Sequence, residues 1–128
     1  MFSKLIALGI AGFAGTIARY ALAGAVYRFT GAEFPWGTLL VNAIGCLLTG
    51  SFWALAEYHL EISGGMRTIV LIGFFGAFTT FSSLMLETAE LARSSEILAA
   101  VKNLVLQNVI GALCLAGGIL LVRSLKGG

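Results

Sequence analysis

The chain has 128 residues, of which 59% are hydrophobic and only 11% are charged. Soluble domains carry about 25% charged residues, so this chain has too few to cover a water-facing surface. The composition therefore excludes an ordinary soluble domain and indicates an integral membrane protein.

Four apolar stretches follow one another along the chain. They are Leu5–Tyr27, which is interrupted only by Arg19, and the uncharged stretches Phe34–Ala56, Thr68–Leu86 and Asn103–Val122. Each is close to the roughly 20 residues that a membrane-spanning helix needs, and a helix satisfies its own backbone in lipid. We therefore expect an all-α membrane protein. The prediction is a single four-helix transmembrane domain over residues 1–128, with helices at about 3–27, 35–58, 67–91 and 100–123.

The basic residues are nearly balanced between the two sides of the predicted bundle. One side holds Lys4, Arg67, Arg123 and Lys126, and the other holds Arg28, Arg93 and Lys102, with Arg19 near it inside the first helix. An excess of Lys and Arg on the cytoplasmic side normally fixes the orientation of a membrane protein. Either one orientation is weakly fixed here, or the chain inserts both ways, and the second option allows an antiparallel pair.

The first predicted helix combines a stripe of small residues with one charge. Gly9, Gly12, Thr16 and Arg19 recur at spacings of three and four, with Gly15 beside them. Small residues at this spacing let two helix backbones approach closely, so packing is the simplest interpretation of the stripe. A charge inside a span is costly and normally faces protein or water. Arg19 is expected to orient the helix, to bridge to a neighbour or to attract an anion.

The second helix carries a polar stripe, in which Thr38, Asn42, Gly45 and Thr49 share one face. Asn42 is its most informative residue because a carboxamide NH2 supplies two hydrogen-bond donors. Inside a membrane these donors require partners, either another helix or a permeating species.

The third stretch contains the most unusual passage, residues 73–83. Four Phe, two Gly and four hydroxyl residues fall within these eleven positions. Gly and the paired Thr79 and Thr80 weaken a helix, and a break inside a membrane is tolerated where it is buried or lines a cavity. Alternatively, the hydroxyl groups bond to their own backbone and keep the helix intact. The positive edges of Phe rings, with amide and hydroxyl donors, suit a small anion.

The fourth helix carries three amides, Asn103, Gln107 and Asn108, near its beginning. This number exceeds what packing requires and suggests a water-filled vestibule. Lys102 beside them is expected to extend toward the membrane surface as an anchor, with attraction of anions as the alternative.

Taken together, the motifs of the first three helices resemble those of the Fluc/CrcB fluoride channels. The matching motifs are Gly12-x-x-Gly15-x-x-x-Arg19-Tyr20, Gly37-Thr38-Leu39-x-x-Asn42-x-x-Gly45 and Gly73-Phe74-x-Gly76-x-x-Thr79-Thr80-Phe81-Ser82. The third motif is highly specific, the first two support it, and the fourth helix matches more loosely. The likeness covers all four helices in the right order.

The resemblance implies a dual-topology, antiparallel homodimer with the third helix broken in mid-membrane. It implies two fluoride pores and a structural sodium ion on the two-fold axis, held by the backbone carbonyls of Gly76 and Thr79 from each subunit. By motif position Asn42 is the pore asparagine, Phe81 the first pore phenylalanine and Glu87 the acidic residue beyond the motif. The expected pore residues are Asn42, Phe81, Leu84, Asn108, Thr38, Ser82 and Ser83, with Arg19 and Glu87 as further site residues.

Some positions depart from the family pattern. Leu84 stands where the family has its second pore phenylalanine, which removes one ring-edge contact. Leu104, Asn108 and Ala112 occupy the polar track of the fourth helix, where the family commonly has Tyr, Ser and Ser. Asn108 retains a donor there, and the other two do not.

The function that these features predict is passive, fluoride-selective export across the inner, cytoplasmic membrane by a multi-pass ion channel. We expect no enzymatic activity and no nucleic-acid partner; the expected partners are fluoride, lipid and a second copy of the chain. A proton-coupled drug exporter of four helices is one rival, but it would need a carboxylate in the first helix, which contains none. An accessory membrane subunit without transport of its own is the other.

Overall fold

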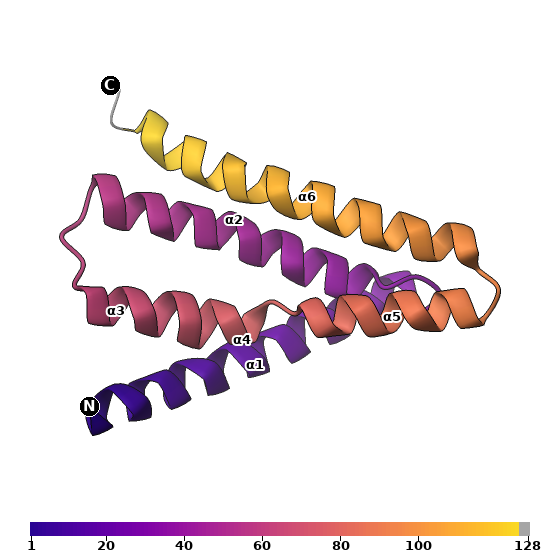
Figure 1. Ribbon diagram of the computed structural model, residues 1–128, viewed down its shortest axis with the longest axis horizontal. Helices are drawn as coiled ribbons and strands as arrows, with labels where there is room; N and C mark the ends of the chain where they lie inside the picture. The colour runs from indigo at the N-terminus through magenta and orange to yellow at the C-terminus, as the bar shows by residue number, and fades with distance from the viewer. Residues whose placement is uncertain (126–128) are drawn as a thin grey trace.

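The computed structural model describes residues 1–125 and is built from helices joined by short loops (Figure 1). Its elements in chain order are α1 (Phe2–Thr30), α2 (Trp36–Tyr58), α3 (Gly64–Thr68), the π-helix η1 (Ile69–Phe75), α4 (Gly76–Phe78), α5 (Phe81–Arg93) and α6 (Ile97–Ser124). Lys126, which we counted with the basic residues above, lies outside the described residues.

Four spans are long and apolar enough to cross a membrane: α1, α2, the composite helix Gly64–Arg93, and α6. This confirms the predicted all-α membrane protein with four transmembrane helices. The beginning of α1, the loop between α2 and α3, and the end of α6 lie at the same end of the molecule, as an even number of spans requires (Figure 1).

The helices extend beyond most of the ranges that we predicted from hydropathy. The helix α1 continues through Arg28 to Thr30, and α6 begins earlier than expected, with the apolar residues Ile97 and Leu98. Gly31 ends α1 with φ 74°, a left-handed conformation that glycine adopts without steric cost. Its N–H donates to the carbonyl of Tyr27 and so closes the last turn.

The third span is interrupted near its middle, as predicted. The helix α4 ends at Phe78 and α5 begins at Phe81, so Thr79 and Thr80 lie between them in extended conformations. We had placed the junction of the two half-helices at Gly76–Thr79, but Gly76 is still helical, with φ −62° and ψ −33°. The interruption therefore starts after Phe78, at the two β-branched residues, which favour extended backbone.

The α2 and α6 helices run in the same direction and pack closely, because glycines occupy their contact (Figure 1). A Cβ atom added at Gly50 would collide with the carbonyl oxygen of Leu115, and one added at Gly118 would collide with that of Leu47. On the other side of the bundle, Gly15 of α1 touches the backbone at Phe74 in the same way. Of the small-residue stripe predicted in α1, Gly15 makes the tight contact, while Gly9 faces open space.

Candidate functional site

The side chain of Asn42 in α2 pairs with the backbone of Thr80 at the break. Thr80 N–H donates to Asn42 Oδ1 at 2.8 Å, and Asn42 Nδ2 donates to the Thr80 carbonyl at 3.1 Å. The side-chain amide of Asn42 thus gives the N–H and the carbonyl of Thr80 the partners that a continuous helix would supply. An unpaired N–H or C=O in a membrane interior costs several kcal/mol, so Asn42 stabilises the break.

The break leaves the carbonyls of Gly76 and Thr79 without their usual partners. In an uninterrupted helix these carbonyls would accept from the N–H groups of Thr80 and Ser83. Thr80 N–H donates to Asn42 instead, and Ser83 N–H donates to Thr80 Oγ1 at 3.2 Å as an N-terminal cap of α5. Both carbonyls that we predicted as sodium ligands are therefore deprived of these helical donors.

A cavity of about 280 Å³ lies between α2, the break and α6, and we call it the Asn42 cavity. Its lining residues are Asn42, Cys46, Thr79, Thr80, Phe81, Leu84, Gln107, Asn108, Gly111 and Ala112. Four of the predicted pore residues therefore share one cavity: Asn42, Phe81, Leu84 and Asn108. Phe81 is 68% exposed, whereas Leu84 is only 4% exposed, so the phenylalanine presents most of its ring to the surroundings and the leucine forms part of the wall.

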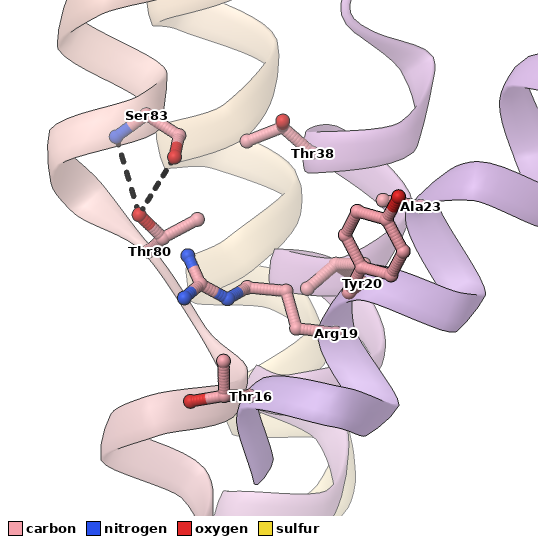
Figure 2. Close-up of a pocket in the computed structure, with 8 residues that line it drawn as sticks. Thr16, Arg19, Tyr20, Ala23, Thr38, Thr80 and Ser83 are labelled. Carbon is pink, nitrogen blue, oxygen red and sulfur yellow. Dashed lines mark hydrogen bonds between the residues drawn. The ribbon is translucent and has the colours of Figure 1, made fainter. Parts of the chain in front are cut away.

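A second cavity, of about 290 Å³, opens between α1, α2 and the start of α5 (Figure 2). We call it the Arg19 cavity, and it is lined by Thr16, Arg19, Tyr20, Ala23, Thr38, Val41, Thr80 and Ser83. The structure thus places Thr38 and Ser83 here rather than in the Asn42 cavity, and Thr80 lines both. Within residues 1–125 the only ion pair joins Arg67 to Glu57, so the half-buried charge of Arg19 has no carboxylate partner there.

The hydroxyl groups at the start of α5 bond mainly to one another. Thr80 Oγ1 donates to Ser83 Oγ at 3.0 Å and lies 3.4 Å from Ser82 Oγ (Figure 2 draws the two contacts with Ser83). Ser82 is exposed and lines neither of the two cavities. A pore role for Ser82 stays a prediction.

Glu87 of α5 is the acceptor of two hydroxyl groups. Its Oε1 accepts from Thr38 at 2.5 Å and from Tyr27 at 3.5 Å, while its Oε2 is buried without a partner among the described residues. The hydroxyl proton of Thr38 is therefore used by Glu87 and is not free to meet an anion. Glu87 also lines a cavity of about 440 Å³ with three other glutamates, Glu33, Glu90 and Glu96, which makes the lining of that cavity acidic.

Two of the three amides of α6 are buried, and the vestibule predicted for them is wrong for Asn103, whereas Gln107 and Asn108 line the Asn42 cavity. Asn103 and Gln107 are 0% and 5% exposed, and Gln107 Nε2 donates to Asn103 Oδ1 at 2.9 Å. Asn108 is exposed and donates to the Leu104 carbonyl of its own helix at 2.7 Å. Of the three amides, Asn108 is therefore the one whose side chain is exposed.

We predicted Gln107 only as one of three vestibule amides and not among the pore residues, although it contacts Asn42 directly. Asn42 Nδ2 donates to Gln107 Oε1 at 2.8 Å, which links α2 to α6 beside the break. A signal was present, because Asn103 and Gln107 lie four residues apart and so share one face of a helix.

Comparison with known proteins gives a consistent result. A family model described as CrcB-like protein, camphor resistance (CrcB), matches residues 6–119. A protein of Nitrosococcus oceani is 51% identical over 114 residues, which cover 89% of this chain and 91% of the relative. One from Desulforapulum autotrophicum is 49% identical, covering 96% and 98%, and one from Geobacter sulfurreducens is 44% identical, covering 96% and 99%. All three relatives are named fluoride-specific ion channel FluC.

Proposed function

This chain belongs to the CrcB-like family, and we infer that it is a fluoride-selective ion channel, a multi-pass protein of the cell membrane. It lowers cellular fluoride by passive export, and no enzymatic step is proposed. Fluoride accumulates because its protonated form crosses membranes and ionises inside. A negative-inside potential drives an anion outward by about 2.3 kcal/mol per 100 mV, so the channel needs no other source of energy.

The observation that carries this proposal is the position of the Asn42 amide beside Phe81 in one cavity. A carboxamide NH2 donates hydrogen bonds, and the edge of a phenylalanine ring is positive. Together they replace part of the hydration shell of a small anion, which is the general basis of selectivity in narrow pores. The Arg19 cavity also lies beside the break, and the charge of Arg19, which has no carboxylate partner within residues 1–125, attracts anions toward it.

We propose that the channel is an antiparallel homodimer with two pores. The helix α1 supports this proposal, because only 6% of its apolar window is buried within one chain. The nearly balanced basic residues at the two ends of the bundle also suit a chain that inserts in both orientations. A membrane-impermeant thiol reagent should label half of the copies of a Glu61→Cys variant in which Cys46 and Cys114 are replaced by Ala. Labelling of all or none would contradict antiparallel insertion.

We propose further that a structural sodium ion binds at the break. The carbonyls of Gly76 and Thr79 fit this ion, because they are neutral oxygens deprived of their helical donors by Asn42 and Thr80. Unwound carbonyls of broken membrane helices are common sodium ligands. Gly76 is also exposed on the single chain, so a second copy can reach it. When bound, the ion would supply a positive charge that offsets the carbonyl dipoles of the break.

Efflux from proteoliposomes tests the function. Vesicles loaded with potassium fluoride and made permeable to potassium should lose fluoride rapidly when they contain the protein, and vesicles loaded with potassium chloride should not lose chloride. Equal loss of the two anions, or no loss of either, would contradict the proposed function.

A further inference from the structure

Both N–H groups of Asn42 are already engaged in the structure. One donates to the Thr80 carbonyl at 3.1 Å, and the other donates to Gln107 Oε1 at 2.8 Å. If Asn42 donates to fluoride, as the proposed function requires, one of these two bonds must exchange for the ion. The inference below rests on that proposed role of Asn42.

The two bonds differ in how firmly they are held. The contact with Thr80 is double, because Asn42 Oδ1 also accepts from Thr80 N–H at 2.8 Å. Turning the amide away from Thr80 would break both hydrogen bonds and free a backbone N–H and a carbonyl together. Releasing Gln107 breaks one hydrogen bond and leaves the pairing with Thr80 in place. The bond to Gln107 is therefore the one that exchanges at lower cost.

A chain of hydrogen bonds fixes which end of Gln107 faces Asn42. Thr88 uses its only hydroxyl proton on the Leu84 carbonyl at 2.7 Å, so its oxygen must accept from Asn103 Nδ2, at 2.9 Å. This orientation points Asn103 Oδ1 at Gln107 Nε2, which leaves the Gln107 oxygen for Asn42. Each amide has one donor end and one acceptor end, so turning a single amide around would break its hydrogen bonds to its neighbours in the chain.

We propose that Gln107 is a positioning residue whose side-chain oxygen holds the second N–H of Asn42 between ions and is displaced by fluoride. Gln107 and Asn42 line the same cavity, so an ion that reaches Asn42 also reaches this bond. The glutamine oxygen spares Asn42 an unsatisfied donor when no ion is present. It also weakens fluoride binding, because the ion must compete with it. A permeating ion must bind weakly enough to leave, and Gln107 supplies that weakening.

Single-channel recording in planar bilayers tests this role with the full-length protein. Gln107→Met keeps the length of the side chain and removes the competing amide oxygen. The fluoride concentration that gives half-maximal current should fall about three- to tenfold, as expected for one lost hydrogen bond of ordinary strength. The maximal single-channel current should fall as well, because each ion leaves Asn42 more slowly.

A merely structural role would change the number of channels but not the half-saturating concentration of those that conduct. His59→Phe is the matched control, because His59 Nε2 contacts the Val122 carbonyl at 3.0 Å between the same two helices, far from Asn42. This control should keep the half-saturating concentration of the wild type. If Gln107→Met does not fold, Gln107→Asn decides, because its shorter side chain cannot hold both Asn42 and Asn103, and the same fall is expected.

An unchanged or raised half-saturating concentration in the variant that folds would overturn the inference, since Gln107 would then not compete with the ion. A wild-type protein that carries no fluoride current would instead contradict the proposed function. The two failures are therefore distinguishable in one experiment.

Discussion

The side chain of Asn42 in α2 and the backbone of Thr80 at the break are joined by two hydrogen bonds, of 2.8 and 3.1 Å. This pairing connects the polar stripe of α2 to the break in the third span. It explains how the membrane tolerates extended backbone there, since the N–H and the carbonyl of Thr80 both find their partners in one side chain. It also fixes the amide of Asn42 at the wall of a cavity.

Asn42→Asp should abolish fluoride conduction. A carboxylate has no N–H to donate to the Thr80 carbonyl or to Gln107, and its charge repels an anion. The buried acceptor left unpaired should also lower the free energy of unfolding by about 1–3 kcal/mol. Fluoride efflux and thermal denaturation of the purified protein measure the two effects. Normal conduction in this variant would reduce Asn42 to a packing residue.

Arg19→Gln should slow fluoride conduction most strongly at low ionic strength. The charge of Arg19 lines a cavity beside the break and has no ion-pair partner within the described chain. Its attraction for incoming anions is screened as the Debye length shrinks from about 30 Å at 0.01 M salt to about 3 Å at 1 M. Arg19→Lys keeps the charge and is the control, which should conduct more nearly as the wild type does. A loss that does not depend on salt would argue for a packing role.

Gly118→Ala should destabilise the protein, whereas Gly117→Ala should not. The added methyl group at Gly118 collides with the Leu47 backbone of α2, but at Gly117 it meets open space within the chain. Forcing two closely packed helices apart costs about 1–3 kcal/mol. The midpoint of thermal unfolding in detergent compares the adjacent variants. Equal midpoints would contradict the close packing of α2 and α6 at Gly118.

Replacing sodium with choline should lower the thermal unfolding midpoint of the purified protein. The proposed ion binds the folded break and not the unfolded chain, so its removal takes away binding free energy from the native state. Potassium at equal ionic strength is the control for nonspecific salt effects. If sodium, potassium and choline give one midpoint, the proposed sodium site is wrong.

The sequence predicted the spans well, because hydropathy over about 20 residues reports directly on the bilayer. The residues of the third stretch indicated a weakened helix but left an intact one open, and the resemblance to the family favoured the break. The residue at which the break starts was harder to predict. Gly76 has a low helix propensity, but its helical conformation is kept by the turn before it, and the Asn42 side chain ends the helix later.

The partners of individual polar residues were hardest to predict. Asn42, Phe81, Leu84 and Asn108 do share a cavity, but Thr38, on the same stripe as Asn42, bonds to Glu87 instead. A polar stripe in the sequence shows which side chains share a face of the helix. It does not identify the residues opposite that face, because these depend on how α2, α5 and α6 pack. The contact between Gln107 and Asn42 could not be predicted for the same reason, because the two residues lie 65 positions apart in the chain.

The most direct test of the central claim is the reversal potential of the purified channel between fluoride on one side of a bilayer and an equal concentration of chloride on the other. A fluoride-selective channel should drive this potential far from zero, in the direction that stops fluoride movement. A reversal potential near zero would mean that both anions pass equally, and it would contradict the proposed function.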